Sequence, residues 1–269
     1  MSAEGFSRLG FGVSGAHGTP LVRRRDTIVL IHDAFEQGVR VFDTAPAYGA
    51  GEAEARLGLA LRDLSRDAVF ISTKAGLFSS GLVRRSRDFS PDAIEQSVLA
   101  SLARLGVEGV DALFLHSAAG EELTPALLDR LEALRRAGAF AMLGAAGRGS
   151  ELDDALDAEC FKAMMAPVHP FLSQAEVERI ARARAAGLDV FAIETAGPGA
   201  PGLHIPRRPA DLYKLAQGVR ARADGHAQGH ARLVAGTGLQ AALENAQVSC
   251  ALFTTTRLAH LQANAALLS

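Results

Sequence analysis

The sequence predicts an α/β protein with the architecture of a (β/α)₈ barrel, also called a TIM barrel. Short apolar runs of strand length alternate with longer amphipathic segments, and this pair occurs eight times along the chain. The length of 269 residues also suits one such barrel, which typically needs about 250 residues. We therefore expect a single domain over residues 1–269, with one long loop insertion between the seventh strand and the seventh helix.

The expected strands are short apolar runs, each about as long as a buried strand. None of them approaches the roughly 18 residues that a membrane span needs. In chain order the runs are Arg8–Val13, Val39–Asp43, Ala68–Lys74, Val110–His116, Phe140–Ala145, Ala163–Pro167, Asp189–Ile193 and Ser249–Thr254.

The expected helices are segments whose apolar residues recur with helical spacing. Ser90-Pro91 has the pattern of an N-cap followed by proline in the first turn, and glycines 106, 138 and 187 stand where a helix should end. The segments are Thr27–Gln37, Glu52–Leu64, Pro91–Leu105, Pro125–Ala137, Leu152–Ala158, Gln174–Ala186, Gly238–Ala246 and Leu258–Leu268.

The insertion interrupts the seventh repeat, between Thr195 and Gly236. It opens with GPGAPGLHIPRRP, continues with an expected helix near Ala210–Arg222, and ends in a stretch rich in His, Gly and Ala. Long loops on the C-terminal face of a barrel are often functional, so this loop is a candidate functional segment.

Composition excludes several classes of partner. The net charge is −2, and aromatic residues make up 6% of the chain with no Trp, which argues against a nucleic-acid site. The N-terminal sequence lacks the pattern of a secretory signal, and the two cysteines, Cys160 and Cys250, do not make a disulfide framework. We expect a cytoplasmic protein in which both thiols are reduced and buried, with no membrane partner and no metal site; the sequence leaves the oligomeric state open.

Four polar residues stand where apolar strands end. They are Asp43 in VRVFDTAPAYG, Tyr48 just after it, Lys74 in VFISTKAG and His116 in VDALFLHS. Strand C-termini converge on one face of a barrel, so side chains from different strands meet there. Each residue alone also has a structural interpretation: Asp43 as the cap of a turn, and His116 as a hydrogen-bonded core residue.

Lys74 is the hardest of the four to interpret as surface charge, because the chain has three lysines and 25 arginines. A Lys that ends an apolar strand can be buried and tuned in a way that Arg cannot. A nearby Lys⁺ favours the phenolate form of a tyrosine such as Tyr48, and the Asp43 carboxylate would hold that Lys charged. A neutral His116 can orient a substrate oxygen, so the four residues predict a proton-transfer group.

These motifs resemble the aldo-keto reductases. The matching pieces run in order as RLGFGVSG, GVRVFDTAPAYGAGEAEARLGLAL, FISTKAG, SPDAIEQSVLASLARLGVEGVDALFLHS and LAHLQANAAL. The similarity is strong over residues 6–147, weak over 148–235 and partial over 236–269, and DTAPAYGAG is closest to bacterial aldose and galactose dehydrogenases. The resemblance implies a (β/α)₈ barrel that uses NADP(H) or NAD(H) to interconvert a small carbonyl compound and its alcohol.

The resemblance also assigns roles. Tyr48 would exchange a proton with the carbonyl oxygen as general acid/base, Lys74 and Asp43 would lower its pKa, and His116 would orient the carbonyl. Tyr48→Phe is expected to abolish turnover while leaving cofactor binding intact.

The match breaks at the nicotinamide end of the cofactor site. The family's Ser-Asn pair after the fifth strand is replaced by Ala146 and Gly147, and Met165 falls near its Gln on the sixth strand. The stacking aromatic of the seventh strand is replaced by Ile193 or Glu194. Losing neutral hydrogen bonds of roughly 0.5–1.5 kcal/mol each would weaken cofactor binding by about two orders of magnitude.

The phosphate end is also altered. After the eighth strand the segment TTTRLAHLQAN offers Arg257 for a phosphate, His260 near the second basic position, and Asn264 for the adenine. Three cations of the insertion could replace lost phosphate contacts by folding over the cofactor, or form a solvated loop: Arg207, Arg208 and Lys214.

Two further patterns carry no function in this interpretation. LGFGVSG satisfies G-x-G-x-x-G, but AHGTPLV follows where a dinucleotide-binding helix would have to start, so we reject a Rossmann site. RRR at 23–25 and RRSR at 84–87 are expected to be solvated loop and helix-start charges.

Two alternatives to the oxidoreductase stay open. One is a cofactor-independent acid/base enzyme of the isomerase or lyase type, because the carboxamide contacts are changed. The other is a non-catalytic binding subunit on the same barrel, against which the retention of all four acid/base residue types argues.

Overall fold

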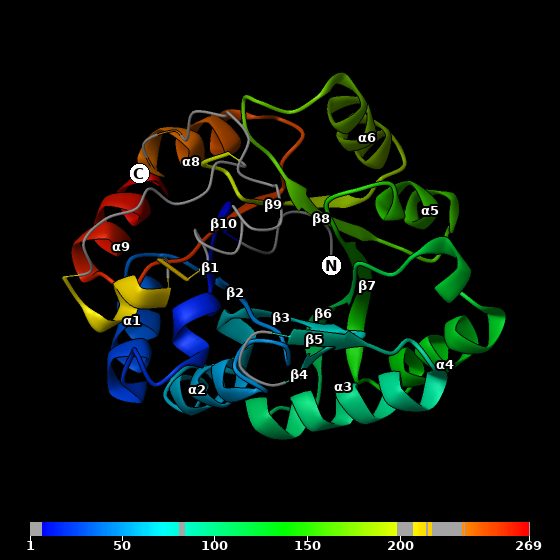
Figure 1. Cartoon of the computed structure of the whole chain (residues 1–269), viewed down its shortest axis with the longest axis horizontal. Helices are drawn as coiled ribbons and strands as arrows, with labels where there is room; N and C mark the ends of the chain where they lie inside the picture. The colour runs from blue at the N-terminus through cyan, green and yellow to red at the C-terminus, as the bar shows by residue number, and fades with distance from the viewer. Residues whose placement is uncertain are drawn as a thin grey trace.

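A computed structural model describes residues 7–80, 84–197, 207–213, 215–216, 233 and 235–268. Within these residues, eight parallel strands close into a barrel in the order β1-β10-β9-β8-β7-β6-β3-β2. Helices lie between successive strands and surround the barrel (Figure 1). The predicted (β/α)₈ barrel is therefore confirmed.

The barrel strands agree closely with the predicted apolar runs. Those ending in Pro167, Ile193 and His116 have the predicted bounds, and the others differ by at most a few residues at either end. The strands are β1 (Leu9–Gly12), β2 (Val41–Asp43), β3 (Phe70–Ala75), β6 (Val110–His116), β7 (Phe140–Ala146), β8 (Ala163–Pro167), β9 (Asp189–Ile193) and β10 (Cys250–Phe253).

The helices follow the predicted amphipathic segments. The helix that starts at Pro91 ends at Leu105 before Gly106, which has the left-handed φ of 69° expected of a helix stop. The helices are α1 (Arg24–Glu36), α2 (Glu52–Leu61), α3 (Pro91–Leu105), α4 (Pro125–Arg136), α5 (Glu151–Asp157), α6 (Gln174–Ala185), α8 (Ala235–Glu244) and α9 (Leu258–Ala265), with 3₁₀ turns at Gly15–Gly18, Arg66–Ala68, Gly120–Glu122 and Ala266–Leu268.

Two sequence-based expectations are wrong. Cys160 is exposed, although the sequence predicts burial of both cysteines; Cys250 is buried. The RRSR segment at 84–87 is not a loop but the strand β5 (Arg84–Arg87), which pairs antiparallel with β4 (Leu77–Ser80) between β3 and α3; Ser86 and Arg87 are exposed, as expected of a solvated segment. Arg87 is held there by an ion pair with Glu122 and by a hydrogen bond of 2.9 Å to the carbonyl oxygen of Ser117. The sequence of β5 does not alternate between apolar and polar residues, so hydrophobic periodicity could not predict this strand.

An apolar cluster closes the interior of the barrel. Phe191 lies within 6 Å of the rings of Phe70 and Phe114, measured between ring centroids at 5.9 and 5.5 Å. Gly144 makes room for this packing, because a Cβ there would lie 2.4 Å from the Phe114 ring. The interior of the barrel is thus a packed core, and chemistry has to take place above it at the strand ends.

Part of the insertion is described. Residues 209–213 and 215–216 are helical, which agrees with the start of the helix expected near Ala210–Arg222; the remainder of that segment lies outside the described residues. Ala210 and Tyr213 pack against Ala16 and Val22, so this segment lies on the connection between β1 and α1. In the described part of the chain no helix is both long and apolar enough to cross a membrane.

Candidate active site

Asp43 and Lys74 form a buried ion pair at the C-terminal ends of β2 and β3. The Lys74 Nζ lies 2.6 Å from Asp43 Oδ2 and 2.7 Å from Oδ1, and it donates a third hydrogen bond of 2.9 Å to the carbonyl oxygen of Thr44. Asp43 is opposite Ser72 in the strand register, and the Ser72 hydroxyl donates to Asp43 Oδ1 at 2.8 Å. Both charges are therefore buried with their hydrogen bonds made.

Tyr48 follows β2 in a turn that requires glycine at the next position. Gly49 has a φ of 66°, and a Cβ on it would lie 1.8 Å from the carbonyl oxygen of Gly18. The turn therefore packs directly on the loop after β1. In this position the Tyr48 ring lies beside Lys74, whose Nζ is 5.5 Å from the ring centroid.

His116 is the last residue of β6 and is buried. β6 pairs with β3, and His116 lies two residues beyond Phe114, the register partner of Lys74. Ser117, the first residue after the strand, has a φ of 62°, and its N–H donates to the Ala146 carbonyl oxygen at 2.6 Å. The structure thus brings Asp43, Lys74 and Tyr48 into contact and places His116 on the neighbouring strand at the same end of the barrel.

The neighbours of Lys74 favour its charged form. Burial opposes an ammonium ion at this site, but the carboxylate of Asp43 and electrostatic interactions with Tyr48 and Glu54 outweigh burial and raise the pKa of Lys74. The ammonium group is therefore present at physiological pH, and it can stabilise negative charge on the phenol oxygen.

Glu54 was not singled out by sequence reasoning. It lies on α2 and is fully buried, where it accepts hydrogen bonds of 2.6 Å from the Thr73 hydroxyl and 2.6 Å from Arg104 Nε. The signal that could have found it is an acidic residue among the apolar positions of α2, at Ala53 and Leu57. Its carboxylate adds a second negative charge behind Lys74.

A model of the Aldo/keto reductase family matches residues 8–269. The chain belongs to this family. The match confirms the resemblance inferred from the DTAPAYG and STKAG motifs and extends it over the segment where the motifs are weak.

Two similar proteins are named as enzymes that act on an aldose and on methylglyoxal. D-threo-aldose 1-dehydrogenase of a Pseudomonas species is 36% identical over 146 residues, which cover 47% of this chain and 44% of that protein. NADH-specific methylglyoxal reductase of Escherichia coli K12 is 34% identical over 123 residues, covering 41% and 38%. The chain thus spans less than half the length of these relatives. An aldo-keto reductase of Bacillus halodurans in its holo form has the same fold, with a TM-score of 0.77 at 21% identity over 98% of this chain and 87% of that one.

The residues predicted to lie at the nicotinamide carboxamide are apolar or already hydrogen-bonded. Ala146 and Met165 are buried and belong to the apolar cluster inside the barrel. The Gly147 N–H donates to the Met165 carbonyl oxygen at 3.0 Å. These three residues offer no side-chain hydrogen bond to a carboxamide, so they do not fit the contacts that the family makes with that group.

An ion pair that sequence reasoning missed lies at this end of the barrel. Arg148, two residues after β7, donates from Nε to Glu194 Oε1 at 2.8 Å and also pairs through Nη2. Glu194 directly follows β9, and β8 lies between β7 and β9. The Arg148–Glu194 pair therefore crosses the C-terminal end of β8.

The predicted phosphate end lies beside the insertion. Arg257 precedes α9 and is 3.8 Å from Asp211, while Arg208 donates to the Thr256 carbonyl oxygen at 3.0 Å. Both contacts thus join the insertion to the loop between β10 and α9. Of the other residues predicted to contact the phosphate or the adenine, His260 and Asn264 lie on α9. Arg207 is exposed, and Lys214 lies outside the described residues.

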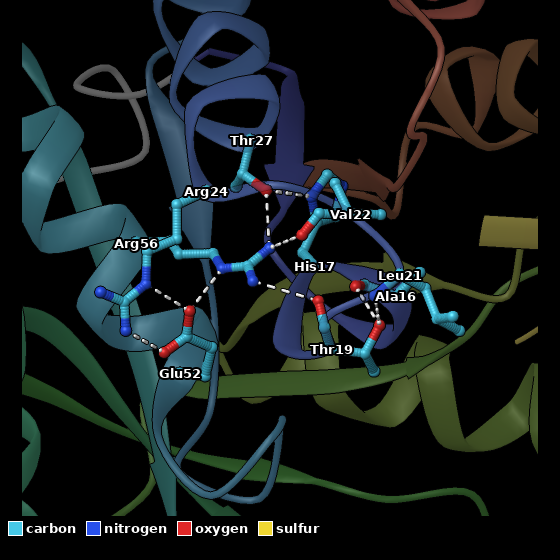
Figure 2. Close-up of polar contacts among 9 residues, drawn as sticks. All are labelled: Ala16, His17, Thr19, Leu21, Val22, Arg24, Thr27, Glu52 and Arg56. Atoms are coloured by element: carbon cyan, nitrogen blue, oxygen red, sulfur yellow. Dashed lines mark hydrogen bonds and ion pairs between the residues drawn. The ribbon is translucent and has the colours of Figure 1, made fainter. Parts of the chain in front are cut away.

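A buried arginine on α2 fixes the loop on which Tyr48 rests. Figure 2 shows Arg56 donating to the carbonyl oxygens of Val22 at 2.8 Å and Thr19 at 3.1 Å, in the segment that leads into α1, and to Glu52 at 2.8 Å. These bonds fix the segment that follows Gly18, the residue packed on the turn after Tyr48. Hydrogen bonds from Arg24 and Arg56 lower the pKa of Glu52 to about 2.

His17 connects this loop to the loop after β10. Its Nδ1 lies 3.1 Å from the Thr27 hydroxyl and its Nε2 lies 2.9 Å from the Thr255 carbonyl oxygen. A carbonyl only accepts, so in the neutral ring the proton is on Nε2 and the Thr27 hydroxyl donates to Nδ1. Burial lowers the pKa of His17 to about 4, although the Thr255 bond opposes the shift.

Proposed function

We propose that this chain is an NAD(P)(H)-dependent oxidoreductase that interconverts a small carbonyl compound and its alcohol, with Tyr48 as general acid/base. The observation that carries the proposal is the burial of Lys74 between the Asp43 carboxylate and the Tyr48 ring. Burying an ammonium group costs desolvation free energy even when the group is paired. Next to a phenol, such an ammonium group makes the phenol a stronger acid, which suits general acid/base catalysis.

The geometry supports the following roles for the four residues. In reduction the Tyr48 hydroxyl gives its proton to the carbonyl oxygen, and in oxidation the phenolate takes it back. The Lys74 ammonium stabilises the negative charge left on the phenol oxygen, and Asp43 holds the ammonium in place through two hydrogen bonds. His116, at the end of β6, orients the substrate oxygen. A bound nicotinamide cofactor would supply or accept the hydride.

The names of the relatives support a small polar substrate. An aldose dehydrogenase, a methylglyoxal reductase and an L-galactose dehydrogenase of Arabidopsis thaliana, the last 30% identical over 148 residues, each align with a part of this chain. Their substrates are carbonyl or alcohol compounds by name.

A second candidate is proton transfer without a nicotinamide cofactor, of the isomerase or lyase type. Ala146, Gly147 and Met165 do not fit the family's carboxamide contacts, and the Arg148–Glu194 pair crosses the same end of the barrel. The proton-transfer group is complete without a hydride donor, so it suits chemistry at a carbon next to a carbonyl.

Titration of the protein with NADPH and with NADH, followed by cofactor fluorescence, separates the two candidates. Binding of either cofactor below millimolar concentration, followed by oxidation of the bound cofactor in the presence of small aldehydes, supports the oxidoreductase. Absence of binding up to millimolar concentration contradicts it, and a screen of carbonyl compounds for cofactor-free turnover then tests the second candidate.

A further inference from the structure

We propose that Arg148 binds a carboxylate on the substrate, so that the enzyme acts on small oxo acids or hydroxy acids rather than on neutral carbonyl compounds. This inference rests on the proposed function, because it names the substrate class of the same site. It goes beyond that function because it assigns substrate-anion binding to Arg148, a residue outside the group of four acid/base residues.

The strand register places Arg148 beside the acid/base group. Ala146 is the register partner of His116, and Arg148 follows Ala146 by two residues on the C-terminal side of the barrel. The Arg148 N–H donates to Glu151 Oε1 at 2.9 Å, so the backbone at this point is fixed. Arg148 and Tyr48 also interact electrostatically, so the guanidinium and the phenol act on the same region above the barrel.

The guanidinium keeps donors available for a ligand. Nε and Nη2 both bond the same oxygen of Glu194, and Nη1 has no hydrogen-bond partner among the residues that the structure describes. The Arg148 side chain is 59% exposed although its base is anchored. A planar guanidinium with free donors at the mouth of a site matches the geometry of a carboxylate.

Backbone conformation adds an independent observation. Glu194 and Ser117 both have left-handed φ values, 52° and 62°, and both directly follow a barrel strand at the site. Non-glycine residues rarely adopt this conformation because it is unfavourable for them, and such positions concentrate in functional sites. Glu194, which pairs with Arg148, thus keeps an unfavourable backbone conformation. A surface ion pair without a functional role would not require this conformation.

The test compares acids with neutral esters of the same skeleton. Turnover of pyruvate against methyl pyruvate, and of 4-oxobutanoate against methyl 4-oxobutanoate, is measured for the full chain and for Arg148→Gln. We expect the wild type to prefer the acid in at least one pair. Arg148→Gln should lower kcat/KM for that acid roughly 10- to 100-fold, as expected for a hydrogen-bonded charge, and change the ester by less than about threefold. Equal losses for acid and ester, or a wild-type preference for the esters, would overturn the proposal.

Three variants sharpen the comparison. Glu194→Gln removes the carboxylate that competes for Arg148, so it should lower KM for the acid, opposite to Arg148→Gln. In Arg148→Gln the unpaired Glu194 carboxylate would itself repel the substrate carboxylate. The double variant Arg148→Gln/Glu194→Gln removes this repulsion and should still lose the preference for the acid. Arg136→Gln, an exposed arginine on α4 paired with Glu132, serves as the matched control and should leave the acid-to-ester ratio unchanged.

Direct binding distinguishes this inference from the proposed function. Calorimetric titration with pyruvate and with 4-oxobutanoate needs no turnover. If no carbonyl compound is turned over, the proposed function fails, while binding of either acid to the wild type and its loss in Arg148→Gln still supports the anion site. Absence of binding by both acids, or equal binding to wild type and Arg148→Gln, contradicts the anion site whatever the turnover.

Discussion

The buried carboxylate of Glu54 accepts a hydrogen bond of 2.6 Å from the hydroxyl of Thr73. Side chains alternate along a strand, so Thr73 faces α2 while its neighbour Lys74 faces the inside of the barrel. Glu54 also pairs with Arg104 of α3. The outer helices are therefore tied to the strand that carries Lys74, and the Glu54 carboxylate contributes to raising the pKa of Lys74.

Removing either acidic neighbour should lower the pKa of Lys74. The folded-state pKa lies above the ordinary value of 10.5, so the ammonium is stabilised below that pH and is lost as pH rises through the raised value. Asp43→Asn should move the loss to lower pH, and Glu54→Gln should do so by less. The chain has three lysines, so the titration can be followed by NMR of the lysine Cε signals. Unchanged titration of Lys74 in Asp43→Asn would show that the ion pair does not control it.

Tyr48→Phe should lower turnover at least 100-fold, because general acid/base catalysis typically contributes about that much or more. Cofactor binding, measured by fluorescence, should stay within about twofold of the wild type. The chain has two tyrosines, and the other, Tyr213, packs near Ala16 on the insertion. Tyr213→Phe is therefore the matched control. Turnover near that of the wild type in Tyr48→Phe would refute the role of the phenol.

The sequence predicts those features of the fold and the site that depend on local residue patterns. Buried strands such as Val110–His116 carry continuous apolar runs, and the polar residue ending each run marks the active-site face. The ion pair between Arg148 and Glu194 could not be predicted, because its residues are 46 positions apart in connecting loops without periodicity. The same holds for Glu54, whose partner Thr73 is identified only by the packing of α2 on β3.

The stability of the protein should fall in acid because of His17. The pKa of its imidazole is about 4 in the folded state and 6.5 in an unfolded chain, so the unfolded state binds the proton first. The free energy of unfolding should therefore decrease as pH falls from 6.5 to 4, by about 3 kcal/mol from this residue. Urea unfolding at pH 7, 5 and 4 measures the effect. His17→Gln should lose most of this pH dependence, whereas His32→Gln, a partly exposed control on α1, should keep it.

Arg56 should matter both for stability and for turnover. It is buried, and Arg56→Met leaves the carbonyl oxygen of Val22 without its donor and takes from the carbonyl oxygen of Thr19 one of its two donors, so the free energy of unfolding should fall by roughly 3–5 kcal/mol. In protein that remains folded, the loop containing Gly18 loses its support, and kcat should fall because this loop positions the turn of Tyr48. Arg24→Gln removes an exposed partner of the same Glu52 and is the control; it should change neither quantity appreciably. If both variants have the same unfolding midpoint and kcat, the buried network does not hold the Tyr48 turn in place.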